Sequence, residues 1–367
     1  AAHPPDRSAG MRLGQQLPRR GRIALDFAPA PRLTVAGPDT SSLAVARPPT
    51  PIRIAVPRLH PTVIAFLLAA CGAPDSSKTA QPPDKPFVPP TRDAATAGFE
   101  RPISVRYDSA ADVFFVANLG SDAAATPHAF ISRVRPDGAI DSLHFIAAGR
   151  DGVQLDAPGA LTLAGDTLWV TDRRVVRAFD ARTGAPGPVI DLAPHHAVSL
   201  AGIARAPDGS LYVTDRGPDG GRGPHANATS TDRIFRIAPD HAVSVALASD
   251  SLQRPSGIAW DARGKRFVIV SFGGASIFSW RPGDAQPRRI GHNSAQMEGV
   301  AMLPDGRMLV TSWRDSSLTI RGADKLTMIA GFPTPAFVGV DTRRNHVAVP
   351  LRDSNRVDIW TIPPIAQ

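Results

Sequence analysis

From residue 99 onward, apolar and polar positions repeat in a phrase of two short strands joined by a tight turn. The second strand of the phrase has a central aliphatic residue between apolar or aromatic neighbours and usually ends in Asp, Asn or Ser. It occurs six times, centred on Val116, Val170, Val213, Ile269, Val310 and Val349. β-Branched and aromatic residues in short runs, separated by turns, predict antiparallel β-strands.

Successive copies of the phrase lie 39 to 56 residues apart, which leaves room for four short strands in each copy. We name these strands a to d from the inside outward; in the fourth copy we expect them over 257–261, 267–271, 275–281 and 287–291. A repeat of about 40–45 residues with four strands is typical of a β-propeller. The sequence therefore predicts an all-β fold, a six-bladed β-propeller of four-stranded antiparallel blades over 99–367. An unrelated β-sandwich or barrel is the alternative.

The last copy of the repeat ends after its third strand, near Pro363. A ring of blades must close without leaving an open strand edge. We therefore expect residues around 85–91 to supply the missing outer strand. The surrounding segment 72–98 is rich in Ser, Pro, Ala and Asp and is otherwise predicted to be a flexible tether.

The N-terminal quarter of the chain has a different composition. Residues 1–98 hold 17 of the 37 prolines, and proline fixes the backbone and removes a hydrogen-bond donor. This stretch is therefore not expected to form regular packed structure. We expect 1–55 to be disordered or an over-extended reading frame, with Val56 as an alternative start.

Residues 56–71 have the organisation of an export signal. A basic flank with Arg58 precedes the apolar run 63–70, which ends at Cys71. The run is far shorter than the about 20 residues that span a bilayer. Leu68, Ala69, Ala70 and Cys71 resemble the lipobox of bacterial lipoproteins. That resemblance implies an acylated Cys71, hence an exported protein in the cell envelope (periplasmic face or outer membrane) that contacts membrane only through its lipid. A buried free cysteine is the alternative.

Net charge divides the chain in a similar way. The 367 residues carry a formal charge of +8 and a pI near 10.6, but residues 1–60 hold nine Arg against three Asp. The remainder holds 32 Lys and Arg against 30 Asp and Glu. Because a nearly neutral body does not attract phosphates, no nucleic-acid partner is expected. The single cysteine excludes an internal disulfide.

Two phrases, Pro255–Asp261 and Leu211–Asp215, resemble those of NHL-repeat propellers. They are more similar to the six-bladed propellers of the gluconolactonase/regucalcin (senescence-marker-protein) type. The resemblance covers 99–363. It implies one divalent ion, usually calcium, at the mouth of the central channel, where the ion polarises a lactone carbonyl and helps to activate water. In that family the ligands are a Glu, an Asn and an Asp just before innermost strands.

The aspartates that end strand a, Asp108 and Asp261, set the register for this comparison. The family's Glu position then falls on Ile103, its Asn position on Ser256 and its Asp position on Glu298. In the remaining blades the position falls on residues without a charged side chain: Pro158, Ala201 and Ala336. Calcium takes six or more oxygen ligands, so Glu298 and Ser256 form a depleted set of candidate metal ligands.

Strand b returns to the same end of the ring, and its terminal residues are the secondary candidates. Asn118, Asp172 and Asp215 lie there, about 5 Å farther from the axis. The two longest b–c loops, 119–129 and 216–231, begin beside them, and loops on a rigid scaffold commonly carry binding sites. The alternative interpretation is that these side chains only cap turns.

Two functions therefore stay open at this stage. One is an exported, lipid-anchored, gluconolactonase-like propeller that acts as a degenerate metal-dependent lactonase or related hydrolase, with calcium as cofactor and Glu298 as a ligand. The other is a non-catalytic NHL-type propeller that binds a small molecule or a protein at the mouth of the ring. The sequence contains no G-x-S-x-G, HExxH, P-loop or dinucleotide-binding motif.

Overall fold

The computed structural model describes residues 88–121, 128–218, 232–322 and 326–364. The chain divides into two units, Ala1–Thr79 and Ala80–Gln367. The first unit lies wholly outside the described residues, and with it the predicted signal 56–71 and Cys71. In the described ranges we find no helix whose length and apolar character would let it cross a bilayer.

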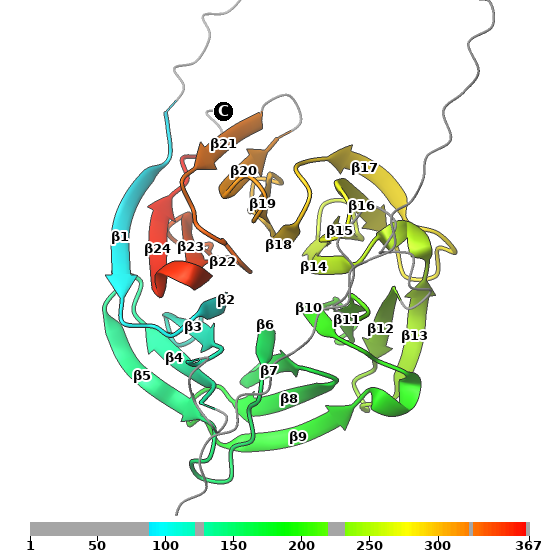
Figure 1. The fold of residues 1–367 in the computed structure, drawn as a ribbon, viewed down its shortest axis with the longest axis horizontal. Coiled ribbons are helices and arrows are strands. Elements are labelled where there is room, and N and C mark those ends of the chain that lie inside the picture. The colour runs from blue at the N-terminus through cyan, green and yellow to red at the C-terminus, as the bar shows by residue number, and fades with distance from the viewer. Residues whose placement is uncertain (1–87, 122–127, 219–231, 323–325, 365–367) are drawn as a thin grey trace, which may run out of the picture. The chain divides into compact units, whose positions relative to one another are not determined.

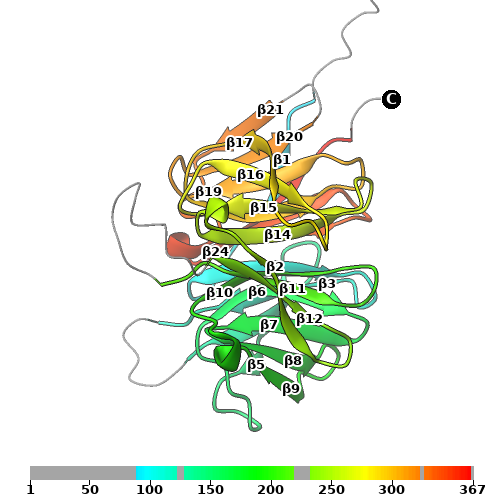
Figure 2. The ribbon, with the colours of Figure 1, turned by 90° about the vertical axis from the view of Figure 1, so that its right-hand side faces the viewer.

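The described residues of the second unit form six four-stranded antiparallel sheets arranged as a ring (Figure 1). This confirms the predicted six-bladed β-propeller. Strand a of each blade lies nearest the axis and strand d on the outside, and Figure 2 shows the ring from its side. In the fourth blade, every observed strand boundary falls within two residues of the predicted one.

The elements follow one another around the ring in chain order. Blades one to three comprise β2 (Pro102–Asp108), β3 (Val113–Asn118), β4 (Phe130–Val134), β5 (Ile140–Ala147); β6 (Pro158–Ala164), β7 (Thr167–Asp172), β8 (Val175–Asp180), β9 (Pro186–Asp191); and β10 (Leu200–Arg205), β11 (Leu211–Asp215), β12 (Arg233–Ile237), β13 (Val243–Ala248). Blades four to six comprise β14 (Pro255–Asp261), β15 (Arg266–Ser271), β16 (Ser276–Trp280), β17 (Arg288–His292); β18 (Met297–Met302), β19 (Met308–Ser312), β20 (Ser317–Arg321), β21 (Leu326–Ala330); and β22 (Gly339–Asp341), β23 (His346–Leu351), β24 (Arg356–Thr361), β1 (Thr91–Ala97). Three 3-10 turns are η1 (Ala193–His195), η2 (Asp250–Leu252) and η3 (Arg352–Ser354).

The core lies between neighbouring blades, which explains why strand b is so apolar. All six residues of β3 are buried, because a blade is covered on both faces by its neighbours. Between blades three and four, the Tyr212 ring packs on Phe267 and on Trp280, with ring centroids 4.6 and 5.8 Å apart. Contacts of this kind hold the blades face to face without a single central core.

A threonine in strand b links one blade to the next. Thr214 Oγ1 accepts the N–H of Gly202 in its own blade at 2.8 Å and donates to the carbonyl of Ser256 in blade four at 2.6 Å. The same pair of hydrogen bonds is formed by Thr171 and by Thr311. It requires a close approach, because a Cβ on Gly202 would collide with the Ser256 carbonyl oxygen.

The sixth blade is completed by a strand from the beginning of the ring. β1 pairs antiparallel with β24, from Thr91 opposite Thr361 to Ala97 opposite Arg356. The closing strand therefore starts where the expected segment 85–91 ends, and residues 85–87 of that segment lie outside the described residues. The ring begins at Thr91 rather than at residue 99, because closure needs a full strand opposite β24.

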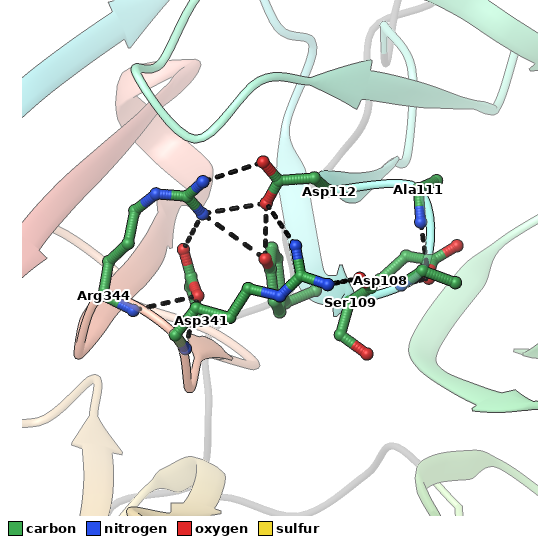
Figure 3. Close-up of polar contacts among 9 residues, drawn as sticks. Asp108, Ser109, Ala111, Asp112, Asp341 and Arg344 are labelled. Carbon is green, nitrogen blue, oxygen red and sulfur yellow. Dashed lines mark hydrogen bonds and ion pairs between the residues drawn. The ribbon is translucent and has the colours of Figure 1, made fainter.

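A polar network joins blades one and six beside this closure (Figure 3). The Arg344 guanidinium donates to both oxygens of Asp112, at 2.7 and 2.8 Å, and to Asp341 at 2.7 Å. The Tyr107 hydroxyl also donates to Asp112. These hydrogen bonds, first from Arg344 and then from Tyr107, hold the pKa of Asp112 well below its usual range. We call Tyr107, Asp112, Asp341 and Arg344 the seam network.

Candidate functional site

One end of the ring carries both the start of each strand a and the end of each strand b. Pro102 pairs with Asn118 in blade one, and Met297 pairs with Ser312 in blade five. We call this end the funnel face, and the opposite end, where strand a turns into strand b, the turn face. The predicted metal position and the strand-b termini all lie at the funnel face.

A backbone hydrogen bond recurs at the funnel face in five of the described blades. In blades one, three, four and five the residue after strand b donates its N–H to the carbonyl of the residue before strand a. In blade six Arg352 donates to Thr334, which precedes the isolated bridge between Pro335 and Leu351, and the five N···O distances are 2.8 to 3.3 Å. The donor and acceptor pairs are Leu119 with Arg101, Arg216 with Ser199, Phe272 with Arg254, Trp313 with Gln296 and Arg352 with Thr334. These side chains therefore border the funnel face, although they fall outside the repeated phrase.

The observed register corrects one member of the predicted metal position. The pairing of Pro158 with Asp172 places Gly159, not Pro158, at the position equivalent to Ser256. The family's Glu position is held by Ile103, whose side chain is buried in the hydrophobic core. A charged side chain is absent from five of the six positions, which hold Ile103, Gly159, Ala201, Ser256 and Ala336.

The sixth position, Glu298, is bound by an arginine. Arg216 follows directly after β11, and its Nη2 donates to Glu298 Oε1 at 2.7 Å and to Ser256 Oγ at 2.9 Å. The side chain of Glu298 is 2% exposed and that of Arg216 14% exposed. The guanidinium also lies 5.1 Å from the ring centroid of Phe272, within cation–π range. One guanidinium thus joins residues from blades three, four and five.

This donor set does not fit a calcium ion. Ser256 Oγ and Glu298 Oε1 both accept from the Arg216 cation, and a second cation between them would be repelled by it. Glu298 Oε2 is buried and has no hydrogen-bond partner among the described residues, so it offers one oxygen where calcium needs six or more. Nowhere in the described ranges do three or more His, Cys, Asp or Glu side chains gather as a metal-binding group.

The secondary candidates Asn118, Asp172 and Asp215 are buried and hold the chain that leads into strand a. Each side chain accepts hydrogen bonds from backbone N–H groups of its own blade, at 2.6 to 3.2 Å. The donors are Glu100 to Asn118, Asp156 and Ala157 to Asp172, and Val198 and Ser199 to Asp215. Arg177 adds an ion pair to Asp172 at 2.6 Å. Their oxygens are therefore engaged in holding the loops.

Next to Arg216 lies a group of side chains that the repeat pattern did not single out. Trp313 packs edge-on against Phe272, with ring centroids 5.2 Å apart. The guanidinium of Arg254 lies 5.4 Å from the Phe272 ring and that of Arg352 lies 5.2 Å from the Trp313 ring. We call Arg216, Arg254, Phe272, Trp313 and Arg352 the arginine–aromatic cluster. Trp313 Nε1 and Arg352 Nε are buried and form no hydrogen bond with a described residue, although Arg352 Nε lies 3.8 Å from the Asp353 carboxylate.

The two long b–c loops begin beside this cluster and on blade one. Within 119–129, residues 122–127 lie outside the described residues; within 216–231, residues 219–231 do. The described part of the second loop contributes Arg216 and Gly217, whose N–H donates to Asp215 at 3.0 Å.

No family model and no curated protein matches this sequence. Solved structures match it at low identity. A luciferin-regenerating enzyme is 12% identical, covers 76% of this chain and 96% of its own, and has a TM-score of 0.58. A gluconolactonase-family protein is 13% identical, with 74% and 91% covered and a TM-score of 0.53. At these identities the similarity shows a shared fold and no more. Virginiamycin B lyase from Staphylococcus aureus matches at 12% identity over 74% of this chain and 99% of its own, with a TM-score of 0.50.

Proposed function

We propose that this chain is a ligand-binding propeller of the gluconolactonase-like fold in which an internal arginine replaces the catalytic divalent ion. The observation that carries the proposal is the pair of hydrogen bonds from Arg216 Nη2 to Ser256 and Glu298. A guanidinium holds its charge permanently and cannot lower the pKa of water as a bound metal does. The site therefore lacks the group that would generate hydroxide.

The chemistry of the arginine–aromatic cluster indicates the class of ligand. Phe272 and Trp313 offer ring surfaces, while Trp313 Nε1 and Arg352 Nε are buried donors that lack a hydrogen-bond acceptor. A buried donor without an acceptor is costly and marks a place where a ligand atom or water belongs. We infer a small planar molecule with a carboxylate, whose oxygens accept from these donors.

Two measurements test this function. Isothermal titration of the wild-type protein with calcium chloride should detect no binding below about 1 mM, and hydrolysis of glucono-1,5-lactone should not change on adding calcium or EDTA. Benzoate, used as a planar carboxylate probe, should bind saturably, and Arg352→Gln should weaken it at least fivefold. Arg289→Gln, on the exposed outer strand β17, is the matched control. Calcium-dependent lactone hydrolysis by the wild type would overturn the proposal.

The proposal also concerns the cellular location of the protein. We propose that the protein is exported and held at the membrane by a lipid on Cys71, on the support of the sequence pattern at 56–71. One acyl chain binds membranes only marginally, so stable anchoring requires more than one chain on the cysteine. Cys71→Ser should abolish metabolic labelling with palmitate and leave unprocessed precursor. Normal labelling of this variant would contradict the anchor.

A further inference from the structure

The axis of the ring contains a cavity of about 340 Å³ that the proposed function does not use. Its walls are residues of strand a from all six blades, the strands that surround the centre of the ring in Figure 1. It extends to Ser109 and Thr342, just beyond the ends of β2 and β22. It begins at residues directly after the predicted metal position, such as Ser104 and Gly202, and runs toward the turn face, and none of the residues of the arginine–aromatic cluster lines it.

One layer of the cavity wall is built almost entirely from small residues. The lining residues of strand a that pair with equivalent positions of strand b are Arg106, Thr162, Ala204, Ala259 and Ala301; the equivalent residue of the sixth blade, Gly339, does not line the cavity. Four of these five side chains are small, which leaves open space at the axis. Arg106 is the exception, and its exposed side chain lines that space.

A second arginine lies nearer the opening. Arg205 is the last residue of β10 and is exposed, and it lies one strand position, about 3.3 Å, closer to the turn face than the level of Arg106. Arg106 and Arg205 are the only charged residues among those that line the cavity. The cavity wall is therefore positive and carries no carboxylate.

Neither arginine is neutralised by the described residues. The guanidinium groups of Arg106 and Arg205 form no hydrogen bond or ion pair with any described residue. Several aspartates at this end of the ring have other partners: Asp112 and Asp341 bind Arg344 (Figure 3), Asp261 binds Arg266, and Asp108 accepts the backbone N–H groups of Ala110 and Ala111. Although its side chain is accessible to the cavity, the surrounding ring partly desolvates the Arg106 guanidinium and lowers its pKa from the ordinary value. A guanidinium still remains charged at neutral pH.

We propose that this axial cavity binds a small organic oxyanion, whose carboxylate or phosphate group pairs with Arg106, while Arg205 attracts it at the turn face. Guanidinium groups bind planar oxyanions through two parallel hydrogen bonds. The cavity volume lies at the lower end of the range for small-molecule sites, which selects metabolite-sized anions over polymers. The small residues in the Arg106 layer leave the room that such an anion needs.

The test uses succinate and inorganic phosphate as probes, titrated into the full-length wild type by isothermal calorimetry at low ionic strength. Succinate binding identifies a carboxylate site, and phosphate binding alone identifies a phosphate site. Arg106→Met should weaken binding of the probe at least tenfold, and Arg205→Met should weaken it less. Arg106→Lys keeps the charge but loses the two parallel hydrogen bonds, so it should weaken binding by an intermediate amount, about threefold or more. Arg289→Met on the outer strand should change nothing.

Two results would overturn the inference: no binding of either probe by the wild type, or equal affinity in wild type and Arg106→Met. If Arg106→Met does not fold, a lack of effect in both Arg205→Met and Arg106→Lys would overturn it in the same way. Arg352→Gln separates this inference from the proposed function. That variant should weaken benzoate binding at the funnel face and leave the affinity for succinate or phosphate in the axial cavity unchanged.

Discussion

At the scale of single residues, Arg216 binds Ser256 and Glu298 through the same nitrogen. Burying a carboxylate is expensive unless a cation and hydrogen bonds accompany it. Removing one partner of a fully buried pair costs about 3–5 kcal/mol, and the cost here is smaller because the Arg216 side chain remains 14% exposed. The arginine therefore stabilises the ring at the predicted metal position.

The first prediction concerns calcium. The triple variant Ile103→Glu, Ser256→Asn, Glu298→Asp restores the family's three ligand types but keeps Arg216, so it should still fail to bind calcium. Adding Arg216→Ala removes the competing cation, and the quadruple variant should bind calcium with a dissociation constant of about 10⁻³ M or tighter. Isothermal titration of the four proteins, including Arg216→Ala alone, measures this. Calcium binding by the triple variant would show that Arg216 does not block the site.

The sequence located Ile103, Ser256 and Glu298 because strand a has a fixed register against strand b. It did not locate Arg216, because a side chain that reaches across two neighbouring blades depends on the loop conformation after β11 and not on the repeat. A signal did exist. The residue directly after strand b varies among blades, as in Arg216, Phe272 and Trp313, while the strand before it is repeated.

At the scale of elements, each residue of the Leu-aromatic-Val-Thr-Asp phrase has its own structural task. In β11, Val213 is buried in the core, Thr214 links blade three to blade four, and Asp215 holds the chain that enters β10. The phrase predicted strands and their spacing well because its buried central residue recurs in all six blades and its threonine link in three of them. The roles of the individual residues could not be predicted from the phrase alone, because the link made by Thr214 depends on how the neighbouring blade packs.

The second prediction tests the threonine link. Thr214→Val keeps the shape of the side chain but removes the partner of the Gly202 N–H and of the Ser256 carbonyl. Unpaired buried groups of this kind cost about 1–3 kcal/mol, so the free energy of unfolding in urea should fall by about that amount. Thr214→Ser keeps the hydroxyl and should lose much less. If both variants lost the same free energy of unfolding, the effect would come from side-chain packing and not from the hydroxyl group.

β1 shows where the sequence was least informative. Its seven residues, Thr91–Ala97, are Thr, Arg, Asp and Ala, and most of them are exposed. It has neither the alternation nor the aromatic residues of a typical strand, since it is an outer strand with one partner. Its position is determined by β24, which is its neighbour in the ring but lies at the opposite end of the propeller sequence.

At the scale of the whole molecule, closure depends on β1, and the third prediction tests it by internal deletion in the full chain. Deleting 72–90 stops before β1 and should leave the melting temperature unchanged. Deleting 72–97 removes β1 and exposes the edge of β24, so the melting temperature should fall by several degrees. Equal melting temperatures for the two deletions would mean that the ring closes without β1.

The fourth prediction concerns acid stability and the seam network. Because the folded-state pKa of Asp112 is lowered, its pairing with Arg344 stabilises the fold fully above the unfolded pKa of about 3.9. This stability is lost as the pH falls below about 4 toward the lowered pKa. Asp112→Asn should therefore melt below the wild type at pH 7, and the gap should narrow toward pH 2.5.

The control for the seam network is Asp151→Asn, an exposed aspartate outside the seam, which should leave the profile of melting temperature against pH unchanged. A gap between wild type and Asp112→Asn that stays constant from pH 7 to pH 2.5 would show that the ionised form of Asp112 does not stabilise the closure.

The pairing of Thr91 with Thr361 also sets the order of events in folding. Two residues opposed in an antiparallel ladder lie about 5 Å apart, yet these two are separated by almost the entire ring in the sequence. Contacts of such long range form late, so the ring should close last. A circular permutant that joins these ends by a short linker and opens the connection between β17 and β18 would make the pairing local and should close faster.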